Sequence, residues 1–277
     1  MFGYYFLAIL QGFFEWLPIS SEGQTVVFAT NFFGIPWENA LSLAIFLHLG
    51  TTLAVIVKFR KEIIKIIKSA YPNPPPDVTE TDKKMRNWII YATIGTAVVA
   101  VPLYLLVKET FAAVQGDVGT LIVVGCLLIT GIILLATRKK YGKNTVEDVP
   151  EKTINKHSTI SGLIQGTAIL PGISRSGVTV SANLLENYEQ NSALKLSFLM
   201  SIPASLAAIA LDFLTEEGSV FNFLDPLTIV ALTAISFAIG YLTIEALLKL
   251  AQRIQFGYFC VFYAVLAFAV ILPFLFL

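Results

Sequence analysis

The stretch "PGISRSGVTV" (residues 171–180) puts a charge into a sequence that is otherwise largely hydrocarbon. Arg175 stands between two serines just after a Pro-Gly pair, and the 13 residues that begin at Ser158 and precede this stretch carry no charge. With 277 residues, of which 56% are hydrophobic and 14% charged, the chain has the composition of an integral membrane protein. An arginine at membrane depth is costly, which makes Arg175 a candidate functional residue.

Charge-free runs of roughly 20 residues predict six transmembrane helices. Five of the runs have 19 to 24 residues. The sixth has 16 and is extended by Lys195 and Asp212, whose side chains can reach the membrane interface. The six runs are 39–57, 87–107, 118–137, 196–211, 226–244 and 254–277.

Two further apolar regions are interrupted near their middle. Residues 1–37 contain the polar segment "LPISSEGQ" after Glu15, and residues 158–187 contain Arg175. The pieces on either side are too short to span a membrane. Each region is therefore expected to be re-entrant, with one helix, a loop near the midplane and a second helix that returns to the same side. Irregular backbone is tolerated at that depth only where protein or a wet cavity encloses it.

A hairpin followed by three spans occurs twice, and an odd number of spans turns the second half upside down. Shifting residues 11–26 by 154 positions supports a duplication, with seven identities among 16 positions. The sequence therefore predicts an all-α integral membrane protein with six transmembrane helices and two re-entrant hairpins. These form an inverted-topology repeat in one membrane domain, with the first repeat at 1–140 and the second at 141–277. The identities are Gln11/Gln165, Gly12/Gly166, Ile19/Ile173, Ser20/Ser174, Gly23/Gly177, Thr25/Thr179 and Val26/Val180.

The distribution of charge predicts the orientation. Residues 58–86 hold eight Lys and Arg, and residues 138–156 hold six. Because cytoplasmic loops are enriched in these residues, both segments are expected in the cytoplasm, with both chain termini outside. The formal net charge is zero, and no segment resembles a nucleic-acid-binding module, so no nucleic-acid partner is expected.

The two interruptions predict an anion site. Ser174 is a natural N-cap for a helix that starts at Arg175, and Ser20 and Ser21 stand at the equivalent place in the first hairpin. If the two loops meet, two helix N-termini, serine hydroxyls and a guanidinium group converge. These are the donors that bind phosphate.

Two carboxylates accompany these donors. Glu15 lies in the first half-helix and Glu22 in the turn that follows. A carboxylate beside a phosphate site is repulsive unless it binds a cation or handles protons. The combination indicates phosphoryl transfer, although a transporter for an anionic substrate would use the same groups.

The segments "QGFFEWLPISSEGQ" (11–24) and "PGISRSGVT" (171–179) resemble the two signature motifs of the undecaprenyl-diphosphate phosphatase family, also called bacitracin-resistance proteins. The resemblance covers the whole chain. It implies a polytopic, often dimeric enzyme of the plasma membrane. Such an enzyme removes the terminal phosphate of a polyprenyl diphosphate and regenerates the lipid carrier for envelope glycan synthesis. The resemblance also implies a site open to the outer face and a divalent cation, Mg²⁺ or Ca²⁺.

The resemblance assigns roles at matching positions. Glu15 and Arg175 match functional residues, and Ser21 matches the serine proposed as nucleophile. We expect the cation on Glu15 and acid–base work on Glu15 or Glu22. The expected substrate-binding residues are Gln11, Ser20, Gln24, Ser174, Ser176 and Thr179.

Three positions depart from the family pattern. Gln11 occupies the first acidic position of the motif, Gln24 stands where a histidine is usual, and Glu22 replaces a commoner small residue. A glutamine cannot transfer a proton, so a mechanism built on the motif histidine does not apply unchanged. His48, inside a predicted span, is expected to have a packing or hydrogen-bonding role.

Three questions stay open at the level of sequence. The nucleophile is either Ser21 or water. The protein is a phosphatase, a polyprenyl-phosphate transporter or flippase, or a homologue that only binds. The carrier is undecaprenyl, another polyprenyl or dolichyl.

Overall fold

A computed structural model describes residues 1–113, 117–137, 142–215 and 219–251, together with residues 258, 261, 262, 265, 266 and 269. In these ranges every regular element is a helix, and the only strand-like pairing is an isolated bridge between Asn144 and Tyr188. Five of the described helices are long and apolar enough to cross a membrane. The all-α membrane class is therefore confirmed.

The helices of the N-terminal half follow the charge-free runs closely. The elements are α1 (Phe2–Phe14), α2 (Ser21–Phe33), α3 (Trp37–Lys58), α4 (Arg60–Lys68), α5 (Glu80–Ala113) and α6 (Asp117–Thr137). Helix α5 starts seven residues before its charge-free run (87–107) because a reciprocal cap begins it there. The Thr79 backbone N–H donates to Asp82 Oδ2 (2.8 Å), and the Asp82 N–H donates to Thr79 Oγ1 (3.3 Å).

The C-terminal half repeats the order of a broken helix pair and long helices. Its elements are α7 (Glu151–Gly166), the 3₁₀ turn η1 (Thr167–Ile169), α8 (Arg175–Leu185), α9 (Gln190–Thr215), α10 (Val220–Phe223) and α11 (Pro226–Ala251). Helix α7 begins at Glu151, seven residues before the predicted start of the second hairpin at residue 158. A helix continues through charged residues wherever they reach water, and the charge-free criterion misses that part. The sixth predicted span, 254–277, lies largely outside the described residues.

Serines start both helices that follow the breaks. The Gly23 N–H donates to Ser20 Oγ, and the Gly177 N–H donates to Ser174 Oγ, each at 3.2 Å. Such a cap is worth about 1 kcal/mol. Ser20 adopts φ +57°, a left-handed conformation that non-glycine residues rarely take outside constrained sites. Both predicted N-caps are confirmed.

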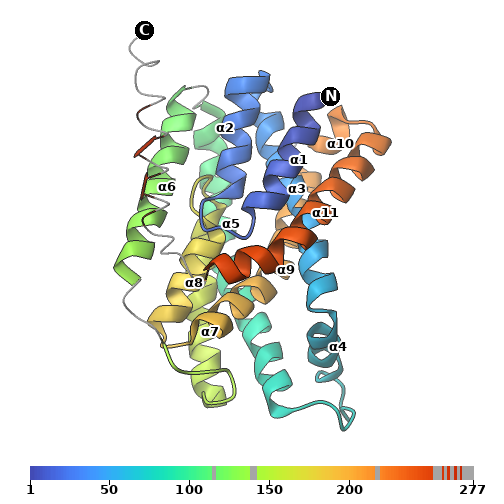
Figure 1. The fold of residues 1–277 in the computed structure, drawn as a ribbon, viewed down its shortest axis with the longest axis vertical. Coiled ribbons are helices and arrows are strands. Elements are labelled where there is room, and N and C mark those ends of the chain that lie inside the picture. The colour runs from blue at the N-terminus through green and yellow to red at the C-terminus, as the bar shows by residue number, and fades with distance from the viewer. Residues whose placement is uncertain are drawn as a thin grey trace.

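The loops of the two broken pairs touch each other at mid-height of the molecule (Figure 1). Ser176 Oγ, in the second pair, donates to Leu17 O in the first at 3.3 Å. Gly172 lets the second loop pack closely on α6, because it has φ +99° and a Cβ there would lie 2.1 Å from Val123 O. Only glycine satisfies both conditions. Residues 159 positions apart in sequence thus meet at the junction of the two loops.

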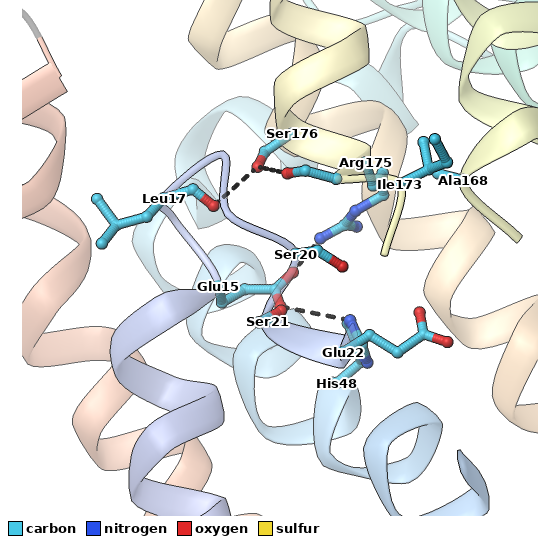
Figure 2. A pocket seen from close by; sticks show the side chains of 11 residues that line it. Glu15, Leu17, Ser20, Ser21, Glu22, His48, Ala168, Ile173, Arg175 and Ser176 are labelled. Atoms are coloured by element: carbon cyan, nitrogen blue, oxygen red, sulfur yellow. Dashed lines mark hydrogen bonds and ion pairs between the residues drawn. The ribbon is translucent and has the colours of Figure 1, made fainter. Parts of the chain in front are cut away.

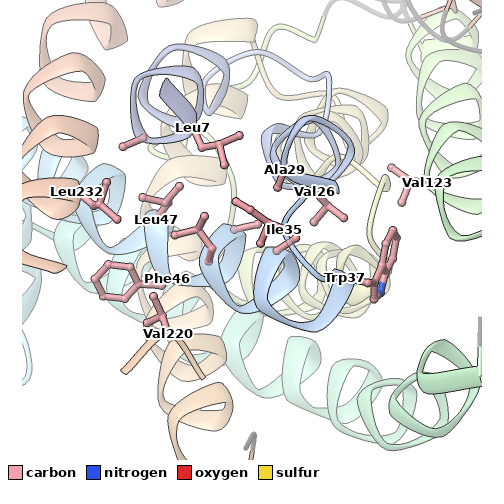
Figure 3. Packing of buried hydrophobic residues seen from close by; sticks show 14 residues of the cluster. Leu7, Val26, Ala29, Ile35, Trp37, Phe46, Leu47, Val123, Val220 and Leu232 are labelled. Atoms are coloured by element: carbon pink, nitrogen blue, oxygen red, sulfur yellow. The ribbon is translucent and has the colours of Figure 1, made fainter. Parts of the chain in front are cut away.

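Helix α3 lies at the centre of the packing around the first pair (Figure 3). Phe46 and Leu47 of α3 are almost fully buried against side chains from α1, α2, α10 and α11. Inside a membrane, such packing is stabilised by close van der Waals contact between side chains and not by removal from water. The core therefore fixes α3 beside the loop of the first pair.

The two halves of the chain pack across each other. Helix α1 packs against α11 of the C-terminal half, and α7 packs against α5 of the N-terminal half. The basic loops that follow α3 and precede α7 lie at the lower end in Figure 1, whereas α10 and the N-terminus lie at the upper end.

Candidate functional site

A polar pocket lies at the junction of the two loops (Figure 2). Its walls come from both broken pairs and from α3, so positions far apart in sequence share one site. The lining residues are Glu15, Leu17, Ser20, Ser21, Glu22, His48, Ala168, Ile173, Ser174, Arg175 and Ser176.

Glu15 contacts several polar residues in and behind the pocket lining. It caps the C-terminal end of α1, and its side chain is 2% exposed. Its Oε2 accepts hydrogen bonds from Gln11 Nε2 (2.7 Å) and Ser21 Oγ (2.8 Å), and its Oε1 pairs with Arg175. These three partners stabilise the buried carboxylate, because burial of an unpaired carboxylate is unfavourable in free energy.

Arg175 is the first residue of α8 and points into the pocket. One guanidinium nitrogen, Nη2, pairs with Glu15, and Nη1 donates to Ser205 Oγ on α9 at 3.1 Å. The side chain is 19% exposed. Residues 15, 21 and 175 thus meet, as the sequence predicted. Ser205 was missed, because only the structure tells which face of α9 meets the guanidinium group.

His48 makes a hydrogen bond within α3, in line with the expected packing or hydrogen-bonding role, and its ring also lines the pocket. Its Nδ1 bonds Ala44 O at 2.8 Å, and its Nε2 lies 3.4 Å from Glu15 Oε2. An intramembrane imidazole was the only signal in the sequence, and periodicity alone does not give its direction.

The expected phosphate-binding hydroxyls divide into two groups. Ser20, Ser174 and Ser176 line the pocket, with Ser174 Oγ and Ser176 Oγ 3.3 Å apart. Thr179 lies one turn deeper and is fully buried. Its hydroxyl bonds Arg175 O (2.7 Å) and Ser197 Oγ (2.6 Å), so it fastens α8 to α9.

Gln11 and Gln24 lie behind the pocket lining. Gln11 joins Glu15 to α2, since its Nε2 donates to Glu15 and its Oε1 accepts from Thr25 Oγ1 at 3.4 Å. Gln24 Nε2 donates to Ile19 O at 3.2 Å, and the residue is 4% exposed. In this geometry both amides hold the first loop in shape.

The pocket offers one carboxylate that suits a cation. The part of the chain that is described holds no group of three or more His, Cys, Asp or Glu residues placed for a metal. Both oxygens of Glu15 already accept from protein donors. Glu22 lines the same pocket, and its carboxylate points away from Glu15 (Figure 2). Hard cations such as Mg²⁺ often use one or two carboxylates plus substrate phosphates, and Glu22 fits that pattern.

The arrangement suits a phosphate group. Two capped helix N-termini, at Ser20 and Ser174, point their dipoles at the junction of the loops. Arg175 adds a planar cation, and Ser21 presents a hydroxyl whose proton is held by Glu15. A nucleophile, a proton acceptor and anion donors therefore share one enclosed space.

Comparison with known proteins assigns the sequence to a family. The family model of bacitracin resistance protein BacA matches residues 4–269. The chain belongs to this family. In this BacA chain the matched range contains every lining residue of the pocket.

Three curated relatives of this BacA chain are named undecaprenyl-diphosphatase. The undecaprenyl-diphosphatase of Methanothrix thermoacetophila is 37% identical over 255 residues, which cover 92% of this chain and 91% of that protein. The undecaprenyl-diphosphatase of Haloarcula marismortui is 37% identical, with coverage of 92% and 91%. That of Methanococcoides burtonii is 36% identical, with 94% of each chain covered.

Proposed function

We propose that this protein is a membrane phosphatase that hydrolyses an undecaprenyl-type polyprenyl diphosphate to the monophosphate and inorganic phosphate. The monophosphate is the lipid carrier, which the reaction makes available again for envelope glycan synthesis. The observation that carries the proposal is the contact of Glu15 with both Arg175 and Ser21 inside a pocket flanked by helix N-termini. Relatives that cover nearly the whole chain are named undecaprenyl-diphosphatase, which supports it.

The proposal includes an architecture of six spans and two re-entrant hairpins in an inverted repeat. Matching packing supports it, because α1 packs on α11 as α7 packs on α5. The plasma membrane is the proposed location, with the pocket opening to the outer face. The basic loops at one end of the molecule support this orientation.

In the proposed reaction the diphosphate enters the pocket while the prenyl tail stays in lipid. Arg175 and the N–H groups at the starts of α2 and α8 hold the phosphates. Ser21 Oγ attacks the terminal phosphorus, the bond from phosphorus to the bridging oxygen breaks, and the monophosphate leaves. The hydroxyl proton passes to Glu15 Oε2, which already accepts it. Water then hydrolyses the phosphoserine and releases inorganic phosphate.

A second nucleophile fits the same geometry. Water bound at Ser21 would attack the phosphorus directly and give its proton to Glu15, with the serine hydroxyl holding the water in line. We propose Glu22 as the residue that holds a divalent cation beside the phosphates. Such a cation would neutralise part of the charge on the diphosphate.

The proposed function is tested with purified protein in detergent and a polyprenyl diphosphate, with inorganic phosphate as the readout. We expect release of phosphate that stops on addition of a chelator and resumes on addition of excess Mg²⁺ or Ca²⁺. Absence of release, combined with tail-dependent movement of the lipid between vesicle leaflets, would instead identify a transporter. Release that is insensitive to chelator would overturn the proposed cation.

Ser21→Ala separates the two nucleophiles. If Ser21 attacks, kcat should fall by roughly 10⁴-fold or more, as expected when a covalent nucleophile is removed. A fall of only about tenfold would assign the attack to water and leave the serine a positioning role. The control is Ser42→Ala, which removes a buried hydroxyl that bonds Asp212 outside the pocket (2.8 Å).

A further inference from the structure

The imidazole of His48 lines the pocket, and the proposed reaction gives it no role. Its side chain is 14% exposed, and it comes from α3, a helix that carries neither of the two sequence motifs. The core around Phe46 and Leu47 fixes this part of α3. The ring is therefore held beside the site by the packing of the two residues that precede it in sequence.

The hydrogen bond to Ala44 sets the orientation of the ring. A carbonyl oxygen only accepts, so Nδ1 carries the proton of the 2.8 Å contact with Ala44 O. Nε2 is thereby directed into the pocket, where its neighbour at 3.4 Å is Glu15 Oε2. That neighbour is also an acceptor. Contact between a ring nitrogen and a carboxylate oxygen needs a hydrogen between the two atoms, so Nε2 faces the pocket as a donor.

The charges that line the pocket favour a further donor to the diphosphate beside Arg175. Apart from His48, its ionisable groups are two carboxylates, Glu15 and Glu22, and one guanidinium, Arg175. Without a bound cation, a diphosphate approaching that set meets an excess of negative charge. A hydrogen-bond donor at His48 Nε2 adds to the donors of the pocket, and it lies near the Glu15 oxygen that is not paired with Arg175.

We propose that His48 is a phosphate-binding residue of this site and donates from Nε2 to a phosphoryl oxygen of the substrate. This inference rests on the proposed function. In the free protein Glu15 Oε2 is the neighbour of Nε2, and in the complex a phosphate oxygen takes that place. His48 and Arg175 then both donate to the diphosphate, from positions on either side of Glu15.

The chain offers a direct spectroscopic test, since it has only two histidines. His157 bonds Tyr188 Oη at 3.2 Å and does not line the pocket. His157→Gln is therefore expected to leave phosphate release unchanged and to make His48 the single source of imidazole ¹⁵N resonances. We expect addition of a prenyl methylenediphosphonate, which cannot be hydrolysed at the bridge, to shift the Nε2 resonance and leave Nδ1 nearly constant.

Kinetics give a second readout. His48→Phe keeps the ring shape without a donor and should lower kcat/KM by about tenfold to a hundredfold, the range of one hydrogen bond to a charged group. His48→Gln keeps a neutral donor and should recover part of that loss. A structural role would give no such recovery, and equal loss in both variants would contradict phosphate binding.

The outcomes separate this inference from the proposed function. Unchanged Nε2 resonances at saturating ligand, with saturation measured by calorimetry, would overturn the His48 contact whatever the activity. A shifted Nε2 resonance in protein that releases no phosphate from the natural diphosphate would support the contact and overturn the hydrolase.

Discussion

Arg175→Ala is expected to lower phosphate release by roughly 10³–10⁵-fold, the range found for arginines that stabilise a transferred phosphoryl group. The guanidinium group is held by Glu15 and Ser205, so it is already oriented when the substrate arrives. Its removal takes away the planar cation of the pocket and leaves Glu15 without its charged partner. The measurement is the rate of phosphate release from a polyprenyl diphosphate by protein that remains monodisperse in detergent.

Two controls accompany this variant. Lys195→Ala removes a cation on α9 that pairs with the carboxylate of Glu62 at 3.4 Å outside the pocket, and activity should stay near that of the wild type. Arg175→Lys keeps a charge but loses the two-sided contact, so it should restore little activity. Activity near the wild-type level in Arg175→Ala would refute the site.

Glu15→Gln is expected to abolish turnover and also to destabilise the protein. The amide cannot accept the proton of Ser21, and it leaves Arg175 as an unpaired, largely buried cation. Breaking a buried pair in this way typically costs about 3–5 kcal/mol. The readouts are phosphate release and the midpoint of thermal unfolding, followed by size-exclusion chromatography in detergent.

A double variant distinguishes the two effects of Glu15→Gln. Glu15→Gln combined with Arg175→Met removes both charges, so the thermal midpoint should rise again while activity stays absent. The matched control is Glu62→Gln, whose partner Lys195 is 40% exposed and loses little. A double variant that is less stable than Glu15→Gln alone would contradict the ion pair as the source of the destabilisation.

The sequence predicts the fold well because hydrocarbon imposes strong rules. Charge-free runs give five of the spans to within a few residues at most ends, and the clusters of Pro, Gly and Ser mark both helix breaks. The charge-free runs do not predict where α5 and α7 begin. A cap at Thr79 starts α5, and α7 begins among charged residues that reach water, so hydropathy decides neither start.

The sequence likewise predicts part of the candidate site and misses another part. Glu15, Ser21 and Arg175 could be found because polar residues stand out in apolar sequence, and the structure brings their loops together. The directions of side chains could not be predicted. Gln24 turns to Ile19 O behind the pocket, while His48 enters the pocket from α3, a helix outside both sequence motifs. Such choices depend on packing between helices, which spacing along one chain does not encode.

The distance in sequence between Glu15 and Arg175 has a consequence for biosynthesis. The two residues are 160 positions apart. At roughly 5–20 residues per second, a ribosome needs on the order of ten to thirty seconds to make the partner of this carboxylate. Gln11 and Ser21, which belong to the first broken helix pair, are made early enough to hydrogen-bond Glu15 during that interval. A nascent N-terminal half therefore has hydrogen-bond partners for Glu15 but lacks its charged partner until the second broken helix pair has been made.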